Sequence, residues 1–249
     1  MAEDVIASGA SLTDSGAAES PEPRRRLVPP PTRWQFAVLM VALLYLAGSV
    51  GYLLGSRRPS RPGKGSVDAG FLYDMIAHHE QAVAMSDLEL ANGDDQRISG
   101  FAREILKFQA YEMGLMQQQL ADWGLPATDP NPEAMEWMGM PVATDQMTGM
   151  ASEAELTALT GARGRDADAL FVPLMQDHHR GGVHMATYAA THAESEFVRS
   201  LATRMARNQR IEVNELEQAR ARAGLPESPP GYEPAQVPAS APADPPDHH

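Results

Sequence analysis

The residues with the clearest metal-binding chemistry in this sequence are two pairs of adjacent histidines. His78 and His79 form one pair, and His178 and His179 form the other. Consecutive helical residues differ in direction by about 100°, so one imidazole of each pair can face the interior of a helical bundle. Imidazole nitrogen is a common ligand of Cu, Zn, Ni and Fe. Two such pairs favour a metal site, and the alternative is four histidines that are satisfied by nearby carboxylates.

A glutamine and a glutamate follow each histidine pair at the same distance along the chain. They are Gln109 and Glu112 after the first pair, and Gln209 and Glu212 after the second. Glu112 shares a helical face with the apolar Ile105, so we expect its carboxylate to point inward. A carboxylate in a core needs a partner, which can be a protonated histidine or a metal. These nitrogen-rich donors favour Cu, Zn or Ni over the hard di-iron sites built from Glu-x-x-His motifs.

Methionine sulfur is the second class of candidate ligand. Met75 and Met85 flank the first histidine pair, and Met175 and Met185 flank the second. Methionine at helical spacing is more typical of core packing, although thioether sulfur also suits Cu(I). Further methionines lie between the two histidine pairs, where they could collect Cu(I) or form an apolar cover anchored by Trp137. These are Met135, Met138, Met140, Met147 and Met150.

The remaining histidines are isolated candidates. His184 and His192 have no counterpart near the first histidine pair, so we expect a surface role for them rather than auxiliary ligation. His248 and His249 end the chain, where they could hold a divalent ion weakly. The sequence contains no Gly-x-Ser-x-Gly motif, phosphate-binding loop or dinucleotide fingerprint, so it predicts no catalytic residue.

The candidate ligands belong to an internal repeat with an offset of 100 residues, as His78 and His178 illustrate. The copies cover about 67–123 and about 166–223, and each shows the apolar periodicity of two helices joined by a short turn. We therefore predict an all-α fold: a ferritin-like four-helix bundle made of two repeated helical hairpins. The Met-rich connection, 124–165, is too long for a plain loop, and Ser152-x-x-Glu155 predicts a capped short helix within it.

The sequence outside the repeats predicts one transmembrane helix before the bundle. Residues 34–55 carry no charge and are long enough to cross a bilayer, so we expect a signal anchor rather than a cleaved signal peptide. Arginines on both sides nearly balance the positive-inside rule, and we expect the folded part, 67–225, to be extracytoplasmic. The other segments are a disordered tail at 1–33, a linker at 56–66 and a disordered proline-rich tail at 226–249.

Composition excludes several classes of function. The 249 residues include 20 Lys+Arg, 33 Asp+Glu and no cysteine, with a formal net charge of −13. The acidic balance argues against nucleic-acid binding. The absence of cysteine excludes disulfides, iron–sulfur clusters and zinc ribbons. Soft-metal chemistry must therefore come from the 8 histidines and 14 methionines, and the negative charge would favour the approach of cations.

Three motifs resemble those of the bacterial family known as domain of unknown function 305. They are F-L-x-x-M-I-x-H-H-x-x-A-V-x-M at 71–85, A-x-x-I-x-x-x-Q-x-x-E-x-x-x-M at 102–116, and G-M-x-S-x-x-E-L-x-x-L at 149–159. The resemblance covers about 67–220. It implies a ferritin-like, four-helical protein, commonly secreted or membrane-anchored, in a family with members that bind copper in the periplasm and aid copper tolerance. The second copy departs from the pattern at Pro173 and at Gly181-Gly182.

We therefore expect a membrane-anchored, extracytoplasmic metal-binding protein that sequesters copper or confers copper tolerance. Zinc, iron and manganese are the alternative metals. Two other functions stay open: a ferritin-like metalloenzyme acting as a metal- or oxygen-dependent oxidase, and a metal-free helical module that binds a partner. The sequence also permits a homodimer.

Overall fold

The computed structural model describes residues 32–55, 62–63, 65–129 and 133–238. Across these residues the regular elements are helices, and the one β pairing is an isolated bridge between Ala134 and Val142. The prediction of an all-α fold is confirmed. The chain divides into two compact units, Met1–Pro59 and Ser60–His249.

The described part of the first unit is a single helix, α1 (Arg33–Gly55). Its apolar stretch, Arg33–Tyr52, is long enough to cross a membrane, and none of it is buried within the protein. Large apolar side chains such as Val41 and Leu44 are exposed along it. By length and composition α1 fits a membrane span, and a signal sequence near the N-terminus has the same properties.

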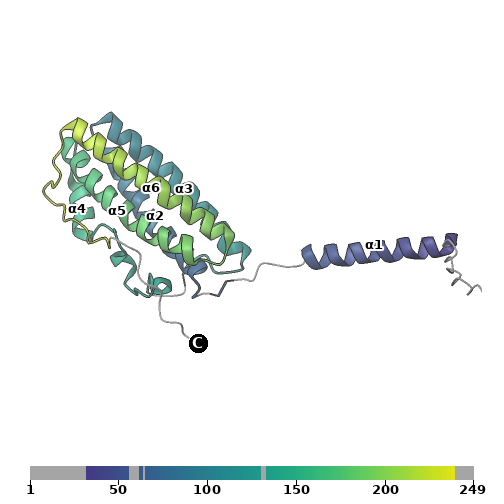
Figure 1. The fold of residues 1–249 in the computed structure, drawn as a ribbon. Coiled ribbons are helices and arrows are strands. Elements are labelled where there is room, and N and C mark those ends of the chain that lie inside the picture. The colour runs from purple at the N-terminus through teal and green to yellow at the C-terminus, as the bar shows by residue number, and fades with distance from the viewer. Residues whose placement is uncertain (1–31, 56–61, 64, 130–132, 239–249) are drawn as a thin grey trace, which may run out of the picture. The chain divides into compact units, whose positions relative to one another are not determined.

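Four long helices form the second unit: α2 (Val67–Asn92), α3 (Gln96–Asp122), α5 (Arg165–His192) and α6 (Glu196–Ala223). The helices of each hairpin, α2–α3 and α5–α6, pack along each other, and the two hairpins meet mainly through α2 and α5 (Figure 1). Far fewer contacts join α3 to α6. The predicted bundle of two helical hairpins is confirmed, with helix ends within a few residues of those expected.

The core consists of two apolar clusters, one toward each end of the bundle. The first contains Met75 from α2 and Met185 from α5, and the second contains Met85 and Met175 from the same two helices. The first turns of α2 therefore lie beside the last turns of α5, so the two helices are antiparallel. The histidine pairs occupy the middle of both helices, between the two clusters.

Each hairpin turn is held by an aspartate from the other hairpin. Asp168, near the start of α5, accepts hydrogen bonds of 3.1–3.2 Å from the backbone N–H groups of 94–95. Asp68, near the start of α2, accepts bonds of 2.8 and 3.0 Å from those of 194–195. A charged acceptor strengthens such bonds at a helix N-terminus. The repeat thus builds a bundle with approximate twofold symmetry, in which each half caps the other.

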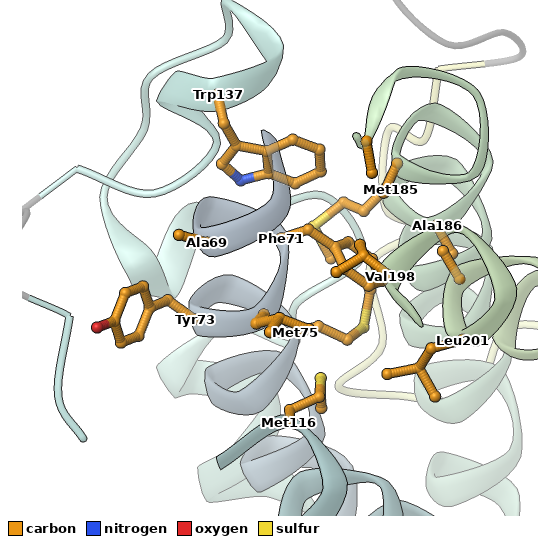
Figure 2. Close-up of a cluster of buried hydrophobic side chains, with 14 of the residues drawn as sticks. Ala69, Phe71, Tyr73, Met75, Met116, Trp137, Met185, Ala186, Val198 and Leu201 are labelled. Atoms are coloured by element: carbon orange, nitrogen blue, oxygen red, sulfur yellow. The ribbon is translucent and has the colours of Figure 1, made fainter. Parts of the chain in front are cut away.

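The connection between the hairpins forms an apolar cover along the side of the bundle that α2 and α5 make. It contains two short 3-10 helices, η1 (Glu136–Met138) and η2 (Thr144–Gln146), followed by α4 (Glu153–Gly161). Trp137 packs edge-on against Phe71, with ring centroids 5.9 Å apart (Figure 2). It packs in the same way against Tyr188, at 5.7 Å between centroids. The indole N–H of Trp137 and the backbone N–H of Met135 both donate to Asp74 Oδ2 at 2.6 Å.

Two further segments of the bundle unit carry defined contacts. Helix α4 begins with the predicted capping box, in which the Ser152 and Glu155 side chains each bond to the other residue's backbone N–H. Residues 226–238 belong to the tail that the sequence predicts as disordered, yet they are held against the bundle. The Tyr232 hydroxyl and the Ala235 N–H donate to Asp177 Oδ2 at 2.7 and 2.8 Å.

Candidate metal centre

The two histidine pairs meet where α2 crosses α5, and all four side chains are fully buried. The rings of His78 and His178 lie 3.7 Å apart between centroids, with an interplanar angle of 32°. His178 Nε2 is 2.8 Å from the backbone carbonyl oxygen of His78, and His78 Nε2 is 3.3 Å from that of Thr148. Because a carbonyl oxygen only accepts, these contacts assign the N–H to Nε2 in both rings and leave Nδ1 with its lone pair.

The outer histidine of each pair faces a glutamate. His79 Nε2 lies 3.0 Å from Glu112 Oε2 in a hydrogen bond, and His179 Nε2 lies 2.7 Å from Glu212 Oε2. The second contact is close, but its angles are not those of a hydrogen bond, and His179 Nε2 has no other partner among the described residues. Both glutamates are partly exposed, so each connects a buried imidazole to the bundle surface.

One ring nitrogen is unsatisfied in all four histidines. The Nδ1 atoms of His78, His79, His178 and His179 are buried and have no hydrogen-bond partner among the described residues. The side chain of Gln109 and the Oε1 atom of Gln209 are in the same condition. A buried polar atom without a partner costs about 1–3 kcal/mol, so such a concentration calls for a physical reason. Metal ligation through Nδ1 would supply one.

Burial keeps the two central imidazoles neutral. Desolvation, together with repulsion from His79 and His179, lowers the pKa of His78 to about 3, and the contact with the Thr148 carbonyl offsets only part of this shift. The pKa of His178 is lowered well below its ordinary value, mainly by desolvation and then by His78. Neutral imidazole is the form that binds metals. Two of the four histidines therefore do not fit the alternative of buried, protonated partners for carboxylates.

A groove between α3 and α6 lies beside the two glutamates that face this centre. Its cavity has a volume of about 240 Å³, and its lining includes Gln109, Glu112, Gln209 and Glu212. Since His79 and His179 contact these two glutamates, an ion that enters the groove meets carboxylate and amide oxygens before it meets imidazole. The repeat supplies one glutamine and one glutamate to each side.

The methionines beside the histidine pairs are packed as core residues. Met75, Met85, Met175 and Met185 are all fully buried in the two apolar clusters. Figure 2 shows Met75 and Met185 among the apolar side chains of the first cluster. Each lies three to seven positions from the histidine pair on its own helix. The structure therefore accounts for them as core packing, and their role as ligands stays a prediction.

The methionines of the connection also face the core. Met135, Met138 and Met147 are buried, and Met140 and Met150 are half-buried against the first apolar cluster. The Met135 sulfur accepts a hydrogen bond of 3.7 Å from the Thr148 hydroxyl. These contacts belong to an apolar cover, and the collection of Cu(I) by these sulfurs stays a prediction.

The predicted ligands do not all converge on one point. In the part of the chain that the structure describes, no group of three or more His, Asp or Glu side chains could hold a metal ion. A metal centre would therefore need Gln or Met ligands besides imidazole, or side-chain rotation. The prediction of a surface role for His184 is wrong, because its side chain is buried. His192 stacks on Tyr188 at 3.9 Å, and His248 and His249 lie outside the described residues.

Sequence reasoning missed the roles of residues that hold the centre and the hairpin turns. The Thr148 carbonyl left no signal, because a backbone acceptor has no sequence signature. The Asp68 and Asp168 caps did leave one, since both aspartates recur at the offset of the histidines. Their recurrence marks a residue that the twofold bundle needs in each half.

The fold and its buried histidines define a duplicated four-helix bundle with a candidate metal centre at its middle. A family model described as domain of unknown function (DUF305) matches residues 68–220. The chain belongs to this family, so the resemblance found in the sequence is confirmed.

Solved structures of the same family have the same fold. A DUF305 protein from Streptomyces coelicolor is 36% identical with a TM-score of 0.62, and the match covers 67% of this chain and 99% of that one. A DUF305 fragment from Deinococcus radiodurans is 28% identical with a TM-score of 0.54, over 63% and 96%. CopM in its Cu(II)-bound form is 24% identical with a TM-score of 0.49, over 64% and 97%, a similarity too low to argue from. A comparison with curated proteins finds no significant match.

Proposed function

We propose that this protein binds copper outside the cytoplasm, held to the membrane by α1, and serves in copper sequestration or tolerance. The observation that carries the proposal is the arrangement of the four imidazoles. Nε2 of each lies against a backbone carbonyl or a carboxylate, while Nδ1 is buried and unpaired among the described residues. Metal-binding histidines commonly have this arrangement, in which the nitrogen that is not a ligand donates to such an acceptor.

The donor atoms favour copper over the alternative metals. Neutral imidazole nitrogen and thioether sulfur are the soft and borderline donors near the centre, and the chain has no cysteine. Copper stands highest in the Irving–Williams order, and thioether sulfur is a ligand that selects Cu(I). Iron and manganese sites of four-helix bundles use more carboxylates, and here Glu112 and Glu212 already face histidines. Zinc is the strongest competitor, since imidazole also suits it.

In this proposal the glutamates and the groove have separate tasks. Glu112 and Glu212 orient the outer imidazoles and attract the cation, because both border the groove between α3 and α6. The net charge of −13 adds a long-range attraction for cations. Copper is the cargo in this scheme, and no reaction is required of the bundle.

The membrane assignment rests on α1. Its unburied apolar stretch would be costly in water and fits a bilayer by length. Exposing intact cells to protease tests the assignment. Cleavage of the C-terminal region without lysis supports an anchored, extracytoplasmic bundle, whereas protection until lysis contradicts it.

The copper proposal can be tested through the two glutamates. Full-length chain carrying Glu112→Gln and Glu212→Gln should bind Cu(I) about 10–100-fold more weakly than wild type in competition with a chromophoric chelator. The control is Glu196→Gln, which removes a carboxylate from an exposed position in the first turn of α6. Equal affinity for all three proteins would contradict the assigned role of the glutamates.

A further inference from the structure

The exposed apolar side chains of the bundle unit are concentrated on one face. Among its described residues, the large apolar side chains that are exposed are Phe108 (61%), Tyr111 (64%) and Ile211 (47%). Phe108 and Tyr111 lie one turn apart on α3, and Ile211 lies on α6 across the groove from Phe108. A cluster of this kind on a soluble domain marks an interaction surface.

The charges on α6 indicate what this surface binds. Arg204, Asn208, Ile211 and Glu215 are all exposed and follow one stripe of the helix, at i, i+4, i+7 and i+11. The stripe is basic at one end and acidic at the other. Neither Arg204 nor Glu215 has an ion-pair partner in the described part of the chain. A helix patterned in this way is complementary to an antiparallel copy of itself.

The complementarity follows from a twofold axis that crosses α6 between residues 209 and 210. It places Arg204 opposite Glu215 of a second copy, and Asn208 opposite Ile211 of that copy. The same operation applied to α3, between residues 109 and 110, places Phe108 opposite Tyr111 of the second copy. The two crossing points, 109–110 on α3 and 209–210 on α6, are equivalent positions of the internal repeat. Gln109 and Gln209, which lie at these points, both line the groove. One axis therefore satisfies the two helices together.

We propose that the α3–α6 face is the interface of an isologous homodimer, in which each helix packs antiparallel to its own copy. The two helices have 27 and 28 residues. At about 1.5 Å per residue and about 10 Å per helix they present a face on the order of 800 Å², which is what a standard interface needs from each partner. The dimer covers the mouth of the groove, and its formation does not depend on metal binding.

Disulfide trapping tests the pairing directly, because the chain has no cysteine of its own. Two differently tagged full-length copies, one with Asn208→Cys and one with Ile211→Cys, are co-expressed and mildly oxidised in membranes. The control uses Thr157→Cys in both copies, an exposed position of α4 on the side formed by α2 and α5. We expect roughly tenfold more linked dimer from the α6 pair than from the control, the ratio that about 1.4 kcal/mol of association produces. Equal yields would overturn the proposal.

Charge reversal in the same assay tests the orientation. Arg204→Glu in both copies places like charges opposite each other at two symmetric points and should lower the linked fraction several-fold. Adding Glu215→Arg restores opposite charges and should restore the linked fraction. Failure of the second change to rescue the first would overturn the antiparallel pairing. Copper content, measured on the Arg204→Glu variant, should stay unchanged, because Arg204 does not line the groove. Failure of the dimer proposal is therefore distinguishable from failure of the copper proposal.

Discussion

The two halves of the bundle, α2–α3 and α5–α6, have the same residue types at the centre of the bundle. They differ at their edges, where each half contacts a segment outside the four long helices. Each half supplies a histidine pair, a glutamate beside the outer histidine, and an aspartate that caps the other half's turn. At the edge, Asp74 of the first half holds the connection, whereas Asp177 of the second half holds the C-terminal segment. The matching positions are Leu174 and Ala77. The repeated residues serve the twofold centre, and the unrepeated ones hold segments that occur once.

The pair of glycines in α5 shows the same division. Gln81 of the first half exchanges hydrogen bonds with the backbone of Ala151, at 2.7 and 2.9 Å. At the matching position, a side chain on Gly181 would collide with the backbone of Thr148, so the connection can lie directly on α5. The departure of the second repeat from the family motif therefore has a physical reason. The first half hydrogen-bonds to the connection through the Gln81 side chain. The second half has a glycine at that position, which lets the backbone of the connection approach α5 closely.

The largest expected difference between the halves is in how the free energy of unfolding depends on pH. It comes from the buried Glu89, whose counterpart in the second half is Ala189. Burial, and then Asp168, raise the pKa of Glu89 from 4.5 to about 8. Between these two values the folded state therefore holds a proton that the unfolded state has released. The stability that this proton contributes is complete below about pH 4.5 and is lost as the pH rises through 8. At about 1.4 kcal/mol per unit of pKa difference, the loss is at most about 5 kcal/mol. Denaturant unfolding from pH 4.5 to 8.5 should show a flatter profile for Glu89→Gln, and an unchanged slope would contradict the assignment.

Removal of the ring that anchors the connection is the next largest change. Trp137→Ala deletes the contacts with Phe71 and Tyr188 and one of the two donors to Asp74, so we expect a loss of about 3–5 kcal/mol in the free energy of unfolding. Thermal and denaturant unfolding measure it. A loss below about 1 kcal/mol would mean that packing of the connection contributes little to the stability of the first half.

The reciprocal caps should give two nearly equal effects. Asp68→Ala and Asp168→Ala each remove a charged acceptor shared by two backbone N–H groups, at a cost of about 2–3 kcal/mol. Asp166→Ala, at an exposed position in the first turn of α5, is the matched control. If one cap mattered and the other did not, the twofold description of the bundle would be wrong.

The smallest effect is expected at the edge of the second half. Tyr232→Phe removes the hydroxyl that donates to Asp177 and should cost about 1 kcal/mol, with the ring still packed. Hydrogen exchange of the Ala235 N–H, which shares the same acceptor, reports the same loosening. Unchanged exchange would show that the hydroxyl does not help to hold the C-terminal segment.

The sequence predicted what is local or repeated. Apolar periodicity predicted the helices, the Ser152-x-x-Glu155 pattern predicted the start of α4, and the offset of His78 and His178 predicted the duplication. These signals lie within a few residues or recur at a fixed spacing.

What the sequence could not predict depends on contacts between distant segments. The stacking of His78 on His178 follows from the crossing of α2 and α5, which no local pattern encodes. His184 looked like a surface residue because its burial depends on tertiary packing. The order of residues 226–238 likewise depends on Asp177, which lies on a different helix.

The copper proposal depends above all on the two buried histidine pairs, 78–79 and 178–179. Its most direct test is the copper content of the full-length chain after exposure to copper and removal of the excess, for wild type and for His78/His79/His178/His179→Ala. We expect stoichiometric copper in wild type and its loss in the variant, with helical circular dichroism confirming that the variant is folded. Only trace copper in wild type, or equal copper in both folded proteins, would contradict it.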